Sequence, residues 1–326
     1  MTIDHILPLT QNELFSCLAK YFKHQKDQKI FVTKKSYILV KGKAPIMLVA
    51  HLDTVHKKPV QTICRSEDGN ILMSPEGIGG DDRCGVYALL EVYRKAEIKP
   101  WLLFTCDEEI GGCGAEHFCK DFRDNQFPNE VKAIKLIVEI DRKGSKDAVY
   151  YDCDCPELEA YIATKGFQTD FGTFSDICLI SPTMGIAGVN LSSGYYNAHT
   201  QHEYIVMSEL ESTIAKVLEI IRESTKDTFP SYKYIQRQLS NVWDYYGTGR
   251  YHSLYGTSVY DNLSLVPTDL SIELTQKYEM LLDIYDPREL EYFRMTYGDE
   301  IIGELYEEEY GDACCGIDSK LEPIND

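Results

Sequence analysis

Residues 101–115 read WLLFTCDEEIGGCGA, and this stretch indicates both a fold and a chemistry. It begins with a mainly apolar run, as is typical of a buried strand. Three carboxylates follow directly, at Asp107, Glu108 and Glu109. Like charges in one loop repel each other, and burying them costs several kcal/mol unless a positive charge compensates. The stretch therefore predicts a buried strand that ends beside a bound cation.

Two other apolar runs share this design. APIMLVA (44–50) precedes His51, and IKLIVEI (134–140) precedes Asp141. Runs that are apolar on both faces suit central strands of a largely parallel sheet, because helices cover both faces of such a sheet. Helical patterns lie between the runs, at 81–97 and 114–122. We therefore predict an α/β fold: a three-layer sandwich with a mixed, largely parallel central sheet and helices on both faces.

The segments around these runs complete the predicted domain. Strand-like runs stand at 29–33, 36–40 and 184–191, and helical patterns at 11–24, 156–167 and 208–225. Pro156 falls in the first turn of its helix, where proline is tolerated. Ser208 is the predicted N-cap of the last helix, because its hydroxyl can accept a hydrogen bond from the first turn.

The composition changes after about residue 226. Residues 226–326 hold 20 Asp and Glu against 8 Lys and Arg, and 13 of the chain's 23 tyrosines. We predict a catalytic domain at 1–225 and an acidic, Tyr-rich, mainly helical C-terminal extension at 226–326, with helical patterns near 268–286 and 287–310. So many amphipathic rings are not left wholly in water. We expect the extension to pack on the catalytic domain or on a second subunit, as in a homo-oligomer.

Composition excludes several classes of function. The formal net charge of −19 disfavours nucleic acid and anionic membrane surfaces as partners, since both require basic patches. No apolar stretch reaches transmembrane length. The first residues, MTIDHILPLTQNELF, have neither the basic nor the apolar region of a signal peptide. Eleven scattered cysteines, an odd number, then indicate free thiols in a reducing cytoplasm.

Polar residues gather where the predicted strands end, which is where ligands bind in open α/β sheets. They come from three strand ends and two loops: His51 and Asp53, Asp107 to Glu109, Asp141, then Asp81 and Asp82 in GIGGDDRCG, and His199 and His202 in NAHTQHEY. Imidazoles and carboxylates together form a nitrogen and oxygen site for divalent metal. So many groups would over-coordinate one ion. Two ions that share a carboxylate would use them economically.

The chemistry of such a site suggests roles. Two metal ions polarise a carbonyl and lower the pKa of a water held between them. A neighbouring carboxylate that binds no metal can then act as general base. The adjacent Glu108 and Glu109 can divide these roles, one on a metal and one on the water. Asp53 lies two residues from His51, so it can accept a hydrogen bond that fixes the imidazole tautomer.

Five motifs resemble those of one family, in the same order. They are AHLDTV (50–55), GGDDRCG (79–85), FTCDEEIGGCGA (104–115), VEIDRKG (138–144) and NAHTQHEY (197–204). Together they resemble the co-catalytic di-zinc exopeptidases: peptidase T, the carboxypeptidase G relatives and the glutamyl-type aminopeptidases. SDICLISPTMGIAGVNL (175–191) also resembles the aminopeptidase branch. The resemblance covers roughly residues 40–225.

The resemblance implies a role for each matching residue. His51, Asp81 and Asp141 resemble the ligands of the first metal, with Asp81 in the bridging position. Glu109 and His199 resemble the other ligands of the second metal. Glu108 resembles the general base, and Asp53 resembles the partner of His51. Asp82 is the alternative to Asp81 in GGDD, although it could instead cap the following helix. His199 is preferred to His202 because NAHT, with Glu203 downstream, matches the peptidase T loop.

The sequence also departs from the family. His56 stands where many relatives have a proline. About 57 residues separate Asp141 from His199, where peptidase T and carboxypeptidase G relatives insert a lid and dimerisation domain. That spacing leaves no room for the inserted domain, so the lid residues that recognise a substrate carboxylate are missing. The lidless aminopeptidases are therefore the closer architectural match.

These observations predict a metal-dependent hydrolase of peptide bonds, an aminopeptidase on short peptides with two divalent ions as cofactors. Zinc is the expected metal, with cobalt or manganese as options. The alternative enzymes are an N-acyl amino acid deacylase or a carboxypeptidase. A non-catalytic binding protein on a peptidase fold is the remaining alternative, but such proteins usually lose ligands or the base. A hydroxyl of Tyr195 or Tyr196, just before the His199 loop, is a further candidate, as donor to an oxyanion.

Overall fold

The structure is a computed structural model that describes residues 1–25, 29–33 and 36–237, and then 274, 277, 278, 281, 290, 294 and 298–310. The chain forms two compact units, Met1–Tyr255 and Gly256–Asp326. The first unit contains the predicted sheet and every predicted site residue. Among the described residues, no helix combines the length and the apolar character that crossing a membrane requires.

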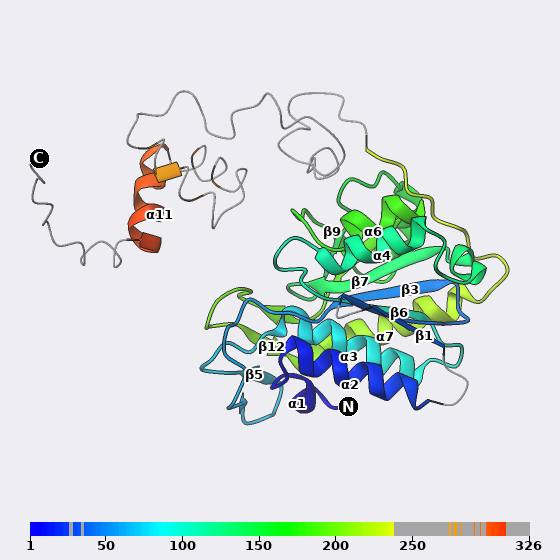
Figure 1. Ribbon diagram of the computed structural model, residues 1–326, viewed down its shortest axis with the longest axis horizontal. Coiled ribbons are helices and arrows are strands. Elements are labelled where there is room, and N and C mark those ends of the chain that lie inside the picture. The colour runs from blue at the N-terminus through cyan, green and yellow to red at the C-terminus, as the bar shows by residue number, and fades with distance from the viewer. Residues whose placement is uncertain are drawn as a thin grey trace, which may run out of the picture. The chain divides into compact units, whose positions relative to one another are not determined.

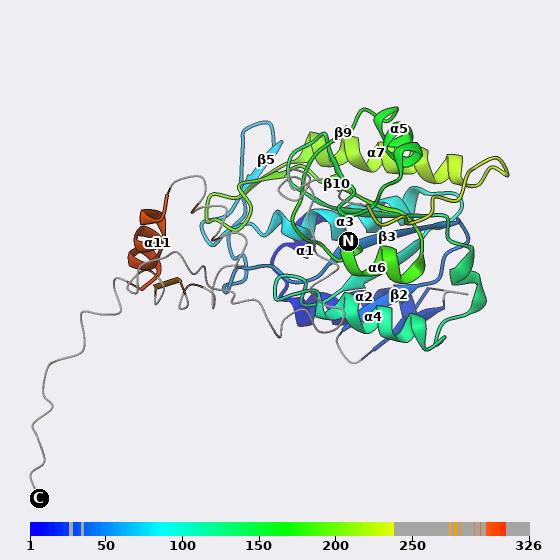
Figure 2. The same ribbon diagram turned by 90° about the horizontal axis from the view of Figure 1, so that it is seen from above.

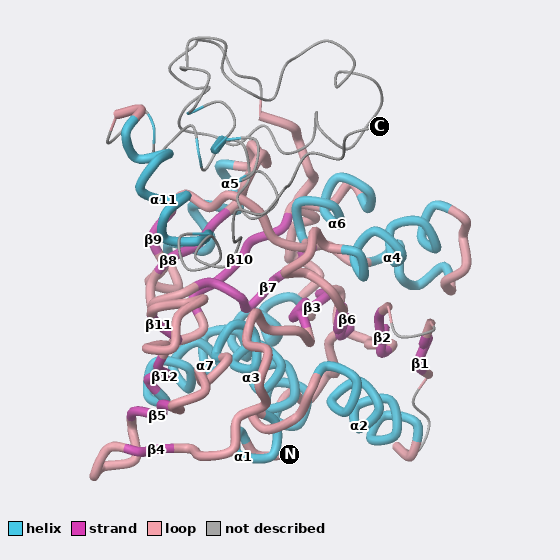
Figure 3. Tube along the Cα trace, turned by 60° about the vertical axis from the view of Figure 1, so that its left-hand side comes forward, coloured by secondary structure: helices cyan, strands magenta, loops and turns pink. Residues whose placement is uncertain are grey.

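The central sheet of the first unit has eight strands among the described residues, in the order β1-β2-β6-β3-β7-β10-β8-β9 (Figure 3). Their bounds are β1 Ile30–Val32, β2 Tyr37–Val40, β3 Ile46–His51, β6 Trp101–Thr105, β7 Leu136–Arg142, β8 Asp147–Val149, β9 Gln168–Thr169 and β10 Gly188–Ser192. The four central strands β6, β3, β7 and β10 run parallel, and β2 and β8 flank them antiparallel. The predicted mixed, largely parallel sheet is confirmed.

Helices cover both faces of this sheet (Figures 1 and 2). One face carries α2, α3 and α7, and the other carries α4 and α6. The helices of the first unit are α1 Ile3–Ile6, α2 Gln11–Lys23, α3 Gly80–Lys95, α4 Cys113–Arg123, α5 Pro156–Ala163, α6 Ile177–Met184 and α7 Met207–Ser224, with a 3-10 turn η1 at Asn129–Ala133. Between β7 and β10 the chain forms only β8, α5, β9 and α6. The three-layer sandwich without an inserted lid is therefore confirmed.

The central strands form where the sequence has continuous apolar runs. Every residue of β3 and of β6 is buried, because helices pack on both sides of them. Helix α2 begins at a capping box, in which Thr10 and Glu13 each accept a backbone hydrogen bond from the other. Pro156 opens α5 as predicted. The predicted N-cap at Ser208 is wrong: the α7 N-cap is Val206, and the Ser208 N–H donates to the Asn70 side chain at 2.9 Å.

A small antiparallel sheet stands beside the central one, in the order β11-β12-β5-β4. Its strands are only two or three residues long: β4 Cys64–Arg65, β5 Ile71–Met73, β11 Tyr195–Tyr196 and β12 Tyr204–Val206. The loop between β11 and β12 contains His199. This sheet therefore places the last predicted ligand, and neither the sheet nor α6 was predicted.

Residues 226–237 belong to the first unit and pack against the rest of it. Phe229 and Tyr232 are buried, and the Tyr232 N–H donates to the Lys135 carbonyl at 3.0 Å. Ile186 and Lys233 form an isolated antiparallel bridge. In the second unit, α11 Glu300–Tyr310 falls in the helical pattern near 287–310, while most of the pattern near 268–286 lies outside the described residues. Tyr278, Leu281, Leu290 and Ile302 form a buried cluster of that unit.

Candidate metal centre

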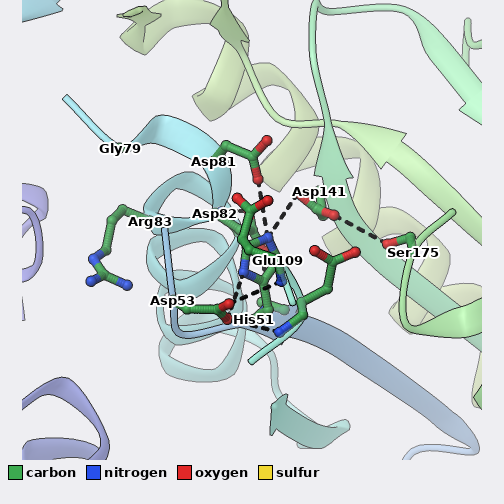
Figure 4. Close-up of polar contacts among 12 residues, drawn as sticks. His51, Asp53, Gly79, Asp81, Asp82, Arg83, Glu109, Asp141 and Ser175 are labelled. Carbon is green, nitrogen blue, oxygen red and sulfur yellow. Dashed lines mark hydrogen bonds and ion pairs between the residues drawn. The ribbon is translucent and has the colours of Figure 1, made fainter. Parts of the chain in front are cut away.

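His51 is the centre of the site and lies buried at the end of β3 (Figure 4). Its Nδ1 lies 3.2 Å from Asp53 Oδ1. On the other side of the ring, its Nε2 lies 3.0 Å from Asp81 Oδ1 and 3.5 Å from Asp141 Oδ1. One imidazole therefore separates the predicted orienting carboxylate from two predicted ligands.

Asp81 lies between the two predicted imidazole ligands. Its second oxygen, Oδ2, is 3.4 Å from His199 Nε2, and that nitrogen is 3.2 Å from Glu109 Oε2. The structure thus brings together all five predicted ligands, which come from β3, the start of α3, the loop after β6, β7 and the β11–β12 loop. An oxygen of Asp81 facing each histidine is the arrangement that a bridging carboxylate needs.

Asp82 occupies a different environment from Asp81. It is completely buried, and its Oδ1 accepts the Gly85 N–H at 2.8 Å in the first turn of α3. Its Oδ2 accepts the His51 N–H at 3.3 Å. Its oxygens also lie close to those of Asp141 and to His51. Because both oxygens accept backbone hydrogen bonds, the geometry favours Asp82 as a structural residue that holds α3 to β3.

Glu108 and Glu109 are held by Asp53. The Glu108 N–H donates to Asp53 Oδ1 at 3.1 Å, and the Glu109 N–H donates to Asp53 Oδ2 at 3.0 Å. Gln11 holds the preceding residue, since its amide donates to Asp107 Oδ1 at 2.7 Å and its oxygen accepts the Asp107 N–H at 3.0 Å. Asp53 thus fixes the two glutamates relative to the imidazole it orients.

Three further side chains hold the predicted ligands, and sequence reasoning did not assign them this role. Glu203 is fully buried, and its two oxygens accept the N–H groups of Gly79 and Asp81 at 2.8 and 2.9 Å. Ser175 donates to Asp141 Oδ2 at 3.1 Å, and Asn190 Oδ1 accepts the Asp141 N–H at 2.9 Å. NAHTQHE and SDICL, in which Glu203 and Ser175 stand, were quoted as motifs, but nothing in them showed these partners.

The remaining predicted candidates lie elsewhere. His202 is exposed, and His56 Nε2 lies 2.9 Å from Glu203 Oε2. The Tyr195 hydroxyl donates to the Asp141 carbonyl at 3.2 Å, and the Tyr196 hydroxyl donates to Glu209 Oε2 at 2.7 Å. Both tyrosine hydroxyls are therefore engaged within the protein, which removes the reason to expect an oxyanion donor among them.

The clustered carboxylates shift each other's protonation. Burial and the Asp81 charge raise the pKa of Asp141 to about 7. Burial raises the pKa of Glu108 well above its ordinary value, and the Asp141, Asp176 and Glu109 charges add to this. Hydrogen bonds to Asp81 and Glu109 raise the pKa of His199 to about 11. A bound cation would relieve the repulsion among these carboxylates.

Two oxygens of the predicted ligands have no hydrogen-bond donor among the described residues. They are Glu109 Oε1 and Asp141 Oδ1, and both are buried. A buried carboxylate oxygen without a donor costs free energy unless a cation or water satisfies it. His51, Asp81 and Glu109 also present ligand atoms that all lie within 4.8 Å of one another. The residues present therefore fit a divalent metal site.

Such a cluster at the strand ends of this fold suits metal-dependent hydrolysis. Residues 36–174 match the model of peptidase family M28. The resemblance to the di-metal exopeptidases is confirmed. No curated protein matches the chain.

Three solved structures show the same fold. A tripeptidase from Staphylococcus aureus subsp. aureus Mu50 has a TM-score of 0.52 and 15% identity, over 68% of this chain and 96% of that one. Aminopeptidase PepT from Bacillus cereus ATCC 10987 has a TM-score of 0.52 and 15% identity, over 69% and 97%. A TET aminopeptidase from the marine sediment archaeon Thaumarchaeota archaeon SCGC AB-539-E09 has a TM-score of 0.50 and 13% identity, over 64% of this chain and 90% of that one. At these identities the likeness shows a shared fold.

Proposed function

We propose that this chain is a metallo-aminopeptidase that removes N-terminal residues from short peptides with two divalent ions as cofactors. The observation that carries the proposal is Asp81, whose two oxygens face His51 and His199. We assign His51, Asp81 and Asp141 to one ion and Asp81, Glu109 and His199 to the other. Zinc is the metal we expect, because imidazole and carboxylate ligands suit it.

Two divalent ions, when bound, polarise the scissile carbonyl and lower the pKa of the attacking water. Glu108 is assigned as the general base. Its carboxylate accepts a proton from the water as the water oxygen attacks the carbonyl carbon, and it returns that proton to the amine as the C–N bond breaks. Asp53 holds the imidazole of His51 and the backbone of Glu108 in position for this transfer.

Two features favour action at a peptide N-terminus. The first is the direct connection from β7 to β10 through β8, α5, β9 and α6, without an inserted domain whose residues would recognise a substrate carboxylate. The second is the excess of acidic groups around His51, since negative charge attracts the ammonium group of a peptide. Solved relatives described as a tripeptidase and an aminopeptidase share the fold. An N-acyl amino acid deacylase or a carboxypeptidase remains the competing activity.

The test compares a tripeptide with its N-acetylated form, each incubated with the full chain and Zn²⁺, Co²⁺ or Mn²⁺. Mass spectrometry of the products identifies which bond is cleaved. We expect release of the first residue from the free peptide and no cleavage of the acetylated one. Equal or faster turnover of an acetylated substrate would show a deacylase, and release of the last residue would show a carboxypeptidase.

A further inference from the structure

A cavity of about 290 Å³ lies beside the candidate metal centre. It is lined by the N-terminal segment around Leu7–Gln11 and by the loops that follow β3 and precede α3. Its charged or ionisable wall residues are Asp53, His56, Lys57, Lys58 and Arg83. The volume equals that of about ten water molecules in the liquid. A carboxylate and the end of the chain that carries it fit within this space.

Cations outnumber carboxylates among the charged residues of this wall, which also has apolar residues. Lys57 and Lys58 are exposed, and neither takes part in an ion pair within the described part of the chain. Arg83 is 3% exposed, and its guanidinium donates to the carbonyls of Leu52 and Leu9, which fixes its position. The two lysines therefore supply uncommitted ammonium groups to a wall that also contains a fixed, buried positive charge.

The single carboxylate of the wall does not cancel this charge for a ligand. Asp53 Oδ1 faces His51 and accepts the Glu108 N–H, and its Oδ2 accepts the Glu109 N–H. Both of its oxygens are thus directed toward the candidate metal centre. The whole chain carries a net charge of −19, so most of its surface repels anions. A cavity lined by two free ammonium groups is an exception on a surface that otherwise repels anions.

The position of the cavity relates it to a bound peptide. Asp53 belongs to both the cavity wall and the candidate centre, and one imidazole separates it from Asp81. Figure 4 shows Asp53 and Arg83 on one side of His51, and Asp141 and Ser175 on the other. A peptide held at the candidate centre can therefore direct one end toward the cationic side. Two extended residues span about 7 Å, a reach suited to neighbouring subsites.

We propose that this cavity binds the C-terminal carboxylate of a short peptide substrate, through the ammonium groups of Lys57 and Lys58. The inference rests on the proposed aminopeptidase activity and adds a determinant of substrate length. Only a peptide whose carboxylate lies within a few residues of the scissile bond reaches both places at once. In lid-bearing relatives, residues of an inserted domain recognise the substrate carboxylate. In this chain the cavity, which a different part of the chain forms, would do so.

The experiment compares a tripeptide with its C-terminal amide as substrates of the full chain with metal. Three proteins are assayed: the wild type, Lys57→Gln/Lys58→Gln, and the control Lys120→Gln/Lys226→Gln. The control removes the same charge from exposed positions outside the cavity. Charge-assisted hydrogen bonds of this kind predict a KM about tenfold lower for the free acid in the wild type and the control. In the cavity variant the KM values of acid and amide should converge, with kcat for the amide unchanged.

Two kinetic outcomes would overturn the inference. One is an equal KM for acid and amide in the wild type. The other is a KM ratio that persists in the cavity variant, or that falls equally in the control, which would indicate long-range charge alone.

A binding measurement separates this inference from the proposed function. Wild type that cleaves neither peptide would count against the aminopeptidase, and calorimetric titration with the same tripeptide and its amide then tests the cavity. Tighter binding of the acid, lost in Lys57→Gln/Lys58→Gln, supports it, and equal binding refutes it. A parallel titration with inorganic phosphate identifies the source of the anion. Phosphate that binds through the two lysines and is not displaced by the tripeptide would show a free-anion site and refute the carboxylate assignment.

Discussion

The two sides of the His51 ring are built from the same kind of group but differ in how their oxygens are satisfied. On the Nδ1 side, both oxygens of Asp53 interact with hydrogen-bond donors, including two backbone N–H groups. On the Nε2 side, Asp141 Oδ1 and Glu109 Oε1 are buried without a donor among the described residues. Carboxylates satisfied by backbone donors hold the loops in one arrangement, whereas the oxygens without a donor are free to bind a cation. The comparison therefore separates residues that shape the site from those we propose as its ligands.

The largest effect should come from Asp81→Ala. Losing the residue that faces both histidines removes a ligand from each proposed ion, so most bound metal and nearly all activity should be lost. Metal analysis of the purified variant by plasma mass spectrometry measures this. Asp154→Ala, an exposed carboxylate outside the site, is the control that should keep its metal. Full metal occupancy in Asp81→Ala would contradict the assignment of Asp81 as a ligand.

A smaller effect is expected from Glu108→Gln, which keeps the shape of the side chain but removes its ability to accept a proton. The kcat should fall by about 10²–10⁴-fold, the usual contribution of a general base. Metal content should stay at the wild-type level, because Glu108 is assigned no ligand role. Loss of metal together with activity would mean that Glu108 and Glu109 have exchanged roles.

The satisfied side is tested by Asp53→Asn, with the smallest expected effect of the three. An amide can accept through only one atom, so at least one of the present hydrogen bonds at this position is lost. Loss of such a partner usually costs about 10–100-fold in metal affinity or activity. Competition with a chelator and steady-state assays measure both quantities. A variant equal to the wild type in metal affinity and in activity would contradict the distinction between the two sides of the His51 ring.

Continuous apolar runs made the centre of the fold predictable. β3, β6 and β7 are buried on both faces, and that pattern is visible in their sequences. The small sheet was not predictable in this way, because strands of two or three residues show no period. Helix α6 was missed since Pro182 lies inside it and its residues are mainly apolar. The Ser208 cap was wrong because Asn70, which is distant in sequence, accepts the hydrogen bond of the Ser208 N–H.

The same reasoning applies to the site. Side chains at strand ends converge because parallel strands end at one edge, so His51, Glu109 and Asp141 could be grouped from the sequence. The residues that hold them lie far away along the chain: Glu203 contacts Gly79 and Asp81, and Asn190 contacts Asp141. Such contacts depend on how distant segments come together in the fold, so no local sequence pattern indicates them.

Glu203 also sets the moment at which the site becomes complete during synthesis. The carboxylate that holds the backbone of Gly79 and Asp81 is made about 150 residues after His51. At a translation rate of about 5–20 residues per second, that interval lasts on the order of ten to thirty seconds. Throughout it, the nascent chain lacks both His199 and the carboxylate that holds the backbone of Asp81, the proposed bridging ligand. Synthesis in this order would keep the proposed hydrolase inactive until Glu203 has been made.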